Sequence, residues 1–202
     1  SHEEINADVN EVFKQLTGLG KANVLRHLWQ APFTLHSNAL AAIRAETEAA
    51  NAGRKGHIIA KMNSLVEPEI IETLYEASQA GVQVELIVRG SCILRPGVKG
   101  LSDNIRVRSI IGRFLEHSRI FYFHADGAEN LYLSSADWME RNFFRRIEVS
   151  FPILDPKLKR RVIKEGLRPY LADNSQAWDM DGNGEFSIRA TRRARSCAQE
   201  SL

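Results

Sequence analysis

The stretch HIIAKMNSLVEPEIIETLYEASQAGVQVELIVR, residues 57–89, decides the fold class. It begins with one short apolar strand, HIIAKM at 57–62, and ends with another, VQVELIVR at 82–89. Between the two strands, apolar residues recur at the spacing of one helix face, at Ile70, Ile71, Leu74 and Ala77. Strand, helix and strand in this order predict a βαβ unit with parallel strands and a right-handed crossover, and therefore an α/β domain.

The two ends of this helix carry local signals. Ser64 and Glu67 have the spacing of a capping box, and Pro68 suits a first helical turn. Gly81 follows the last apolar position and suits the end of a helix.

Two further helices are predicted before this unit. Residues 5–16 place apolar side chains at helical spacing and form an N-terminal helical appendage. Residues 39–51 are strong helix formers, with Ser37 or Asn38 available as the N-cap and glycines following the last turn.

After residue 104 the pattern changes to strands. Four stretches have strand character, with HADGAEN between the second and third as a hairpin loop: NIRVRSII (104–111), HSRIFYF (117–123), NLYLSS (130–135) and RRIEVSFPI (145–153). A last helix is predicted from the cap Asp155 to Asn174, with apolar residues facing inward. The sequence thus predicts a mixed β-sheet flanked by helices, with an N-terminal helical linker.

Composition narrows the class of protein. The chain has 202 residues, of which 44% are hydrophobic and 26% charged, as in an ordinary globular domain. No apolar run approaches the ~20 residues that cross a bilayer, and the acidic start SHEEINADVN does not resemble a signal peptide, so a cytoplasmic location is expected. Cys92 and Cys197 lie far apart, which argues against a disulfide framework, redox chemistry or a zinc site.

The stretch FLEHSRIFYF, Phe114 to Phe123, places a histidine and an arginine where a buried strand should begin. In a strand that starts near His117, the side chains of His117 and Arg119 would share one face. Imidazole can attack phosphorus or protonate a leaving oxygen, and a guanidinium binds non-bridging phosphate oxygens, so the pair suits a phosphoryl group. A polar cap on a strand edge is the alternative, and spacing alone leaves both interpretations open.

Arg89 stands at the C-terminal end of strand 82–89 and is followed by Gly90. Ligands of open α/β sheets bind at that edge, so Arg89 is a candidate anion-binding residue, with an ordinary surface arginine as the alternative. Lys61, near the end of strand 57–62, could reach the same edge.

The segment SSADWMERNFFRRIEV, residues 134–149, is rich in groups that bind phosphate or orient such groups: Ser134, Ser135, Asp137, Arg141, Arg145, Arg146 and Glu148. We expect Glu148 to orient a histidine or an arginine by hydrogen bonding. The aromatic residues Trp138, Phe143 and Phe144 are expected in the core.

Two features near the C-terminus suggest functions that we do not favour. DMDGNGEF, residues 179–186, matches the start of an EF-hand loop, but its twelfth position is Ala190 and no helix pair flanks it, so a hairpin turn is predicted. Four arginines could bind a polyanion, although a solvated tail is preferred: Arg189, Arg192, Arg193 and Arg195. No glycine-rich phosphate loop, HExxH or GxSxG motif occurs in the sequence.

Residues 5–190 resemble the C-terminal part of bacterial polyphosphate kinase. The most specific blocks are IGRFLEHSR at 111–119 and SSADWMERN at 134–142. That family makes inorganic polyphosphate reversibly from ATP. The resemblance implies that this chain is the second of two phospholipase D-like domains, each of which gives one histidine to a shared site.

The resemblance also implies site residues. His117 matches the family's second active-site histidine, Arg89 matches an arginine that contacts the ATP phosphates, and Arg146 would face the same pocket. The phospholipase D pattern asks for histidine, then lysine two residues on, then aspartate five further, but this chain has His117, Arg119 and His124. These departures favour the kinase-like branch over a phosphodiesterase.

The resemblance further implies what lies outside the chain. The phosphate-accepting histidine, the Mg²⁺ site and the adenine-binding domain would be upstream, so no metal ligand is assigned here and the fragment is expected to be inactive alone. The implied division is a linker at 1–35, a catalytic domain at 36–190 and a basic tail at 191–202.

The expected partners are ATP or ADP as substrate, inorganic polyphosphate, the upstream domains and further copies in a homo-oligomer, but no nucleic acid. Peripheral membrane association is an alternative to a purely cytoplasmic location. Two alternative functions stay open: a phosphodiesterase half-site acting as a homodimer, and a polyanion-binding module.

Overall fold

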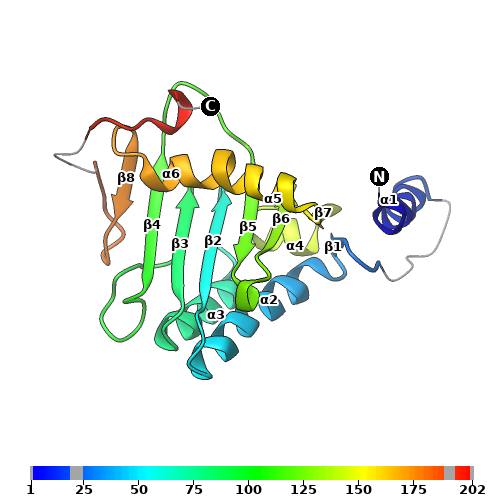
Figure 1. Cartoon of the computed structure of the whole chain (residues 1–202), viewed down its shortest axis with the longest axis horizontal. Coiled ribbons are helices and arrows are strands. Elements are labelled where there is room, and N and C mark those ends of the chain that lie inside the picture. Colours follow the sequence, from blue (N-terminus) through cyan, green and yellow to red (C-terminus); the bar gives the residue numbers. More distant parts are fainter. Residues whose placement is uncertain (1, 19–24, 189–193, 201–202) are drawn as a thin grey trace.

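A nine-stranded mixed sheet organises the part of the chain that the computed structural model describes, residues 2–18, 25–188 and 194–200 (Figure 1). The strand order is β1-β7-β6-β5-β2-β3-β4-β8-β9. The strands are β1 (Trp29–Ala31), β2 (His57–Met62), β3 (Gln83–Val88), β4 (Ile105–Ile110), β5 (Arg119–Phe123), β6 (Asn130–Ser134), β7 (Glu148–Pro152), β8 (Ala177–Met180) and β9 (Phe186–Ile188). The helices are α1 (Glu3–Leu16), α2 (Leu35–Asn51), α3 (Pro68–Gln79), η1 (Ala125–Gly127), α4 (Glu140–Phe144), α5 (Pro156–Val162), η2 (Ile163–Leu167), α6 (Arg168–Ala172) and η3 (Ala198–Glu200).

The centre of the sheet is parallel, which confirms the predicted βαβ unit. β2 pairs in parallel with β3, and β3 pairs in parallel with β4. β5 lies antiparallel beside β2. The C-terminal ends of β2, β3 and β4 therefore meet the N-terminal end of β5 at one edge of the sheet, which we call the site edge.

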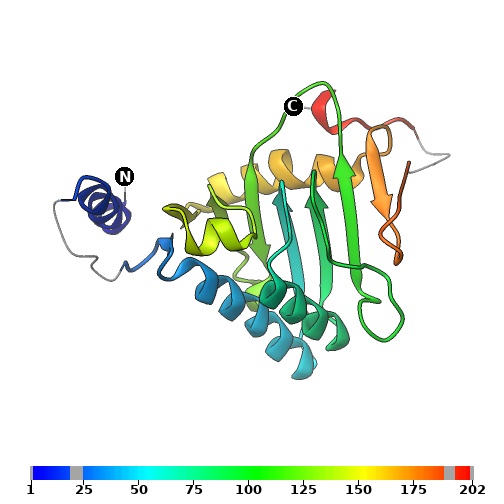
Figure 2. The ribbon, with the colours of Figure 1, turned by 180° about the vertical axis from the view of Figure 1, so that it is seen from behind.

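Helices cover both faces of the sheet, so the predicted α/β fold with a mixed sheet is confirmed. The helices α2 and α3 cover one face (Figure 2), and the rod formed by α5, η2 and α6 covers the other (Figure 1). Side chains alternate between the two faces along each strand. In β5, Phe121 and Phe123 pack in the core under α2 and α3, whereas Ile120 and Tyr122 pack with Leu167 on the opposite face.

Two predicted helix caps are wrong, although Pro68 occupies the first turn of α3 as predicted. Helix α3 is capped by Glu67, whose carboxylate accepts a hydrogen bond from Ile70 N at 2.7 Å, and not by a capping box with Ser64. Helix α2 begins at Leu35 after Thr34, before the predicted caps Ser37 and Asn38. A turn sets this earlier start, because Thr34 N donates to Gln30 O at 2.7 Å.

The predicted cap Asp155 is confirmed, since its carboxylate accepts from the backbone N–H groups of Lys157 and Leu158. The predicted hairpin at DMDGNGEF is also confirmed, because β8 and β9 pair antiparallel around a turn in which Asp181 accepts from Asn183 N. The edge strand β1 was not predicted.

Both terminal segments are tied to the domain by buried carboxylates. Asp8 of α1 accepts hydrogen bonds from the backbone of Arg26, His27 and Leu28. Asp173 accepts a hydrogen bond from Ala198 N at 2.7 Å. The part of the predicted tail around Ala198 therefore packs against the end of α6. Arg189, Arg192 and Arg193 lie outside the described residues. Within the described ranges, no helix combines the length and apolar character that a membrane span requires.

Candidate functional site

A small cavity of about 20 Å³ lies at the site edge, with room for about one water molecule. Strand ends and the segment before β5 form its walls. Its polar lining residues are Lys61, Asn63, Arg89, Glu116, Ser118 and Tyr170, and its apolar ones are Met62, Ile87 and Ile110. The structure therefore brings Arg89 and both sequence neighbours of His117 to one place.

Arg89 is held in place by its backbone and by Asn63. Its N–H donates to Met62 O at 3.3 Å, and its Nε donates to Asn63 Oδ1 at 2.9 Å. These contacts leave both terminal guanidinium nitrogens without a hydrogen bond to the described residues. A half-buried arginine with a fixed Nε and two available Nη groups can bind an anion through a fork of donors.

Little room is left for a side chain at Gly90, next to Arg89, because the backbone after the neighbouring strand β2 comes close. Gly90 N donates to Asn63 O at 2.8 Å, and a Cβ at Gly90 would lie only 3.0 Å from the same oxygen.

His117 lies in a loop and not in the strand, so the predicted alternation of His117 and Arg119 is wrong. β5 begins at Arg119, where pairing with β6 begins. The His117 imidazole is exposed and makes no hydrogen bond within the described part of the chain. Its carbonyl oxygen accepts from Arg119 Nη1 at 2.8 Å.

Arg119 is occupied by Asp137. Its Nε donates to Oδ1 at 3.1 Å and its Nη2 donates to Oδ2 at 2.9 Å. Asp137 also accepts from the backbone N–H of Asn63 at 2.7 Å. A chain of hydrogen bonds through Asn63, Asp137 and Arg119 therefore connects Arg89 to the backbone of His117.

Asn63 was missed by the sequence analysis. The residue as a whole is 9% exposed, and its Nδ2 is a buried donor with no partner among the described residues. Buried amide donors are normally paired, so an unpaired one at a site is a candidate contact for a ligand or water. The one signal that could have identified Asn63 is its position directly after β2, at the edge of the sheet where ligands bind.

Lys61 reaches the site edge, as expected, but its ammonium group holds the loop before β5. Lys61 Nζ donates to Glu116 Oε2 at 2.6 Å and to Ser118 Oγ at 2.8 Å, and lies 3.5 Å from the centre of the Tyr170 ring. Burial lowers the pKa of Lys61, and the hydrogen bond to Glu116 opposes that shift. Burial would raise the pKa of Glu116, but hydrogen bonds from Lys61, Tyr170 and Gln199 lower it overall.

The segment 134–149 differs from its prediction in two details. Glu148 accepts hydrogen bonds from Ser135 and Asn142, and it does not orient a histidine or an arginine. Trp138 and Phe143 are fully buried as predicted, whereas Phe144 is 46% exposed.

Arg146 is exposed in the bend between α4 and β7. It does not line the small cavity at the site edge, and it makes no ion pair with any residue in the described ranges.

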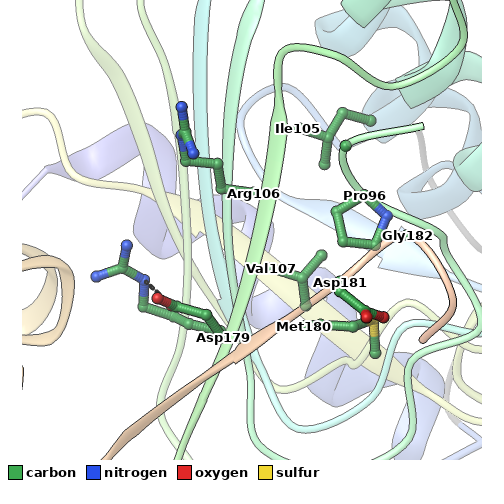
Figure 3. Close-up of a pocket in the computed structure, with 10 residues that line it drawn as sticks. Pro96, Ile105, Arg106, Val107, Asp179, Met180, Asp181 and Gly182 are labelled. Atoms are coloured by element: carbon green, nitrogen blue, oxygen red, sulfur yellow. Dashed lines mark ion pairs between the residues drawn. The ribbon is translucent and has the colours of Figure 1, made fainter. Parts of the chain in front are cut away.

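A larger cavity of about 320 Å³ lies between β4 and the β8–β9 hairpin (Figure 3). Its walls carry charges of both signs, with Arg106 and Arg108 on β4 and Asp179 on β8, and Arg108 and Asp179 form an ion pair at 4.0 Å. None of the predicted site residues lines this cavity.

The family model described as "Polyphosphate kinase C-terminal domain 2" matches residues 28–199. Curated proteins named polyphosphate kinase are similar over 200 residues, with 60% identity for Burkholderia cenocepacia (strain HI2424) and 59% for Paraburkholderia phytofirmans. Each match covers 99% of this chain, and the chain spans 29% of the length of these relatives.

Solved structures agree with this match. The crystal structure of polyphosphate kinase from Porphyromonas gingivalis superposes with a TM-score of 0.94 and 37% identity, over 99% of this chain and 31% of that one. Nuc from Salmonella typhimurium, a phospholipase D family member, superposes with a TM-score of 0.53 and 16% identity, over 76% of this chain and 96% of that one. The second likeness shows a phospholipase D-like fold.

Proposed function

The chain belongs to the polyphosphate kinase C-terminal domain 2 family, and from that premise we propose that it supplies one half of a phosphoryl-transfer site. In the full-length enzyme this site would transfer the γ-phosphate of ATP reversibly to inorganic polyphosphate. The observation that carries the proposal is the shared cavity, where Arg89 lies with the residues on either side of His117.

His117 would assist departure of ADP. In the proposed reaction a histidine of the upstream domain attacks the γ-phosphorus, so a nitrogen–phosphorus bond forms as the bond to the bridging oxygen breaks. The bond electrons leave with the ADP oxygen, which His117 would protonate or hydrogen-bond. The exposed imidazole without a partner supports this role, because it is available to a ligand.

Arg89 would bind the phosphate oxygens. Phosphoryl transfer depends mostly on positioning and on stabilisation of spreading negative charge, and a pre-oriented guanidinium supplies both. Asn63 supports this role by fixing Nε, which leaves the two Nη groups for oxygen atoms. Arg146 is a weaker candidate for the same task, because its exposed guanidinium would have to turn toward the site.

Mg²⁺ is expected in the full-length enzyme, since family members use ATP. The described residues contain no cluster of three histidine, cysteine or carboxylate side chains that could hold it. We expect the Mg²⁺ ligands to lie in the upstream part of the full-length enzyme.

A phosphodiesterase function is less well supported. Arg119, at the position of the motif lysine, is bound by Asp137 and so is not available to a substrate phosphate. His124, at the position of the motif aspartate, follows the C-terminal end of β5, at the edge opposite His117.

The proposal is tested by assaying ATP-dependent polyphosphate synthesis with this chain alone and with the full-length enzyme. We expect synthesis only by the full-length enzyme. In that enzyme, Arg89→Ala should raise KM for ATP by about a hundredfold, whereas Arg106→Ala, on β4, should leave it unchanged. Synthesis by the chain alone, or an unchanged KM in the Arg89 variant, would contradict the proposal.

A further inference from the structure

The loop that carries His117 lacks an apolar anchor of its own. Residues 111–118, here called the His117 loop, connect β4 to β5 without regular secondary structure. Its large apolar side chains point outward, with Ile111, Phe114 and Leu115 exposed by 62%, 60% and 68%. Polar contacts must therefore fix the conformation of this loop.

Gln199, near the C-terminal end of the described chain, makes those contacts with one side-chain amide. Phe114 N donates to Gln199 Oε1 at 3.0 Å, and Gln199 Nε2 donates to Phe114 O at 2.8 Å. The same Nε2 donates to Glu116 Oε1 at 2.9 Å. The Gln199 amide thus pairs with both backbone polar groups of Phe114, as a residue of a neighbouring strand would. It also binds the side chain of Glu116, the residue before His117.

Close packing of the loop beside Gln199 supports a specific contact. A Cβ at Gly112 would overlap the side-chain amide oxygens of Gln199 and Gln176. The backbone of Gly112 therefore lies against the ends of two glutamine side chains, and these ends would have to move to admit a side chain at residue 112.

Gln199 is itself firmly held. It follows Ala198, which is fully buried and whose N–H donates to Asp173. Ser196 and Asn174 exchange two hydrogen bonds, Ser196 N to Asn174 Oδ1 at 2.8 Å and Asn174 N to Ser196 O at 3.0 Å. These contacts hold residues 196–198 against the rest of the domain, so Gln199 directly follows a packed segment.

Glu116 joins this support to the sheet. Its carboxylate accepts from Lys61 on β2, from the Tyr170 hydroxyl on α6 and from Gln199. Three elements that are distant in sequence therefore converge on the residue before His117.

We propose that Gln199 is a positioning residue for His117, acting through the backbone of Phe114 and the carboxylate of Glu116. This inference rests on the proposed catalytic role of His117. A catalytic group must be held close to its productive geometry, and a shift of about 1 Å costs on the order of a hundredfold in rate. Without the amide of Gln199, the exposed His117 loop would sample other positions.

The test uses Gln199→Ala in the full-length enzyme, with Gln79→Ala as a matched control. Gln79 also donates from Nε2 to a backbone oxygen, that of Gly100, and lies at the end of α3 outside the site-edge cavity. Amide hydrogen exchange of residues 113–118 should become faster in the Gln199 variant and stay unchanged in the control. The variant should lose roughly tenfold to a hundredfold in kcat, with KM for ATP changed by less than about twofold.

A second variant separates loss of the contact from a general loss of structure. Gln199→Glu keeps the acceptor for Phe114 N, but it removes the donor to Phe114 O and places a carboxylate against Glu116. Its kcat should fall at least as far as in Gln199→Ala, while exchange in β2 and β3 stays slow. Equal loss of protection across β2, β3 and the His117 loop would overturn the positioning role.

The outcomes distinguish this inference from the proposed function. If His117→Ala abolishes turnover while Gln199→Ala changes neither exchange nor kcat, the positioning role is wrong and the proposed function stands. If His117→Ala leaves turnover intact, the proposed function fails first. Faster exchange of the His117 loop with unchanged kcat would also overturn the positioning role, because turnover would then not depend on how firmly the loop is held.

Discussion

The carboxylate of Asp137 binds the guanidinium of Arg119 through two parallel hydrogen bonds, at 3.1 and 2.9 Å. The pair is mostly buried, with side-chain exposures of 18% for Arg119 and 10% for Asp137. Arg119 also holds the carbonyl oxygen of His117. Arg119, two residues after His117, therefore holds the backbone at this site, whereas Arg89, which follows β3, has its two Nη groups available to a phosphate.

Removal of Asp137 should strongly destabilise the chain. Asp137→Ala leaves the Arg119 charge without its partner and removes the acceptor of Asn63 N, so we expect a loss of about 3 kcal/mol in the free energy of unfolding. Denaturant unfolding of the chain measures this loss. Glu140→Ala breaks the exposed pair with Arg145 and should cost about 0.5 kcal/mol or less. Similar losses in the free energy of unfolding for the two substitutions would show that the buried pair stabilises the fold no more than the exposed pair does.

Asn63→Asp tests whether the unpaired Nδ2 faces bound phosphate. The substitution keeps an acceptor for Arg89 Nε but replaces the buried donor with a negatively charged oxygen, which repels phosphate. We expect KM for ATP in the full-length enzyme to rise by about tenfold or more. Asn104→Asp, at the opposite edge of the sheet, makes the same chemical change and should leave KM unaltered. An unchanged KM in both variants would remove Asn63 from the phosphate site.

Gly90→Ala should disturb the site through the backbone. A Cβ at 3.0 Å from Asn63 O forces the ends of β2 and β3 apart by a few tenths of an ångström, which would misplace Arg89 relative to Asn63. We expect a loss of about 1 to 3 kcal/mol in stability and weaker ATP binding. Gly182→Ala is the control, since its Cβ would make only contacts of 3.4 Å. Wild-type stability and ATP affinity in Gly90→Ala would contradict the close approach.

The stability of the domain should depend on Glu116 in acid. Because the hydrogen bonds from Lys61, Tyr170 and Gln199 lower its folded-state pKa below the usual 4.5, the ionised carboxylate stabilises the fold above that value. This contribution is lost as pH falls through the lowered folded-state pKa. Glu116→Gln should therefore reduce stability at neutral pH, and its difference from the wild type should shrink as the pH drops below about 4.5. A difference that stays constant down to pH 2 would contradict the assignment.

The sequence predicted the elements of the fold better than their ends. Hydrophobic periodicity identified β2, α3 and β3, because these elements are long enough to bury a repeating face. The start of α2 was missed because a turn to Gln30 sets it. The start of β5 was misplaced by two residues because pairing with β6 begins only at Arg119, and this shift moved His117 from a strand to a loop.

The supports of the site could not be predicted from the sequence. Asp137 lies 74 residues from Asn63, and Gln199 lies 85 residues from Phe114. Such contacts leave no periodic or local signal, because they depend on which strand ends and which C-terminal residues the fold brings together. Arg89 could be placed at the site edge from the sequence, because ligands of α/β sheets bind where parallel strands end, and its role in phosphate binding stays a prediction.

The most direct test of the central claim is the kcat of polyphosphate synthesis in the full-length enzyme with His117→Ala, compared with His124→Ala. His124 lies at the other end of β5 and serves as a matched histidine control. If His117 assists the departure of ADP, His117→Ala should lower kcat by on the order of a hundredfold or more, and His124→Ala should leave it near the wild-type value. Wild-type turnover in His117→Ala would contradict the account.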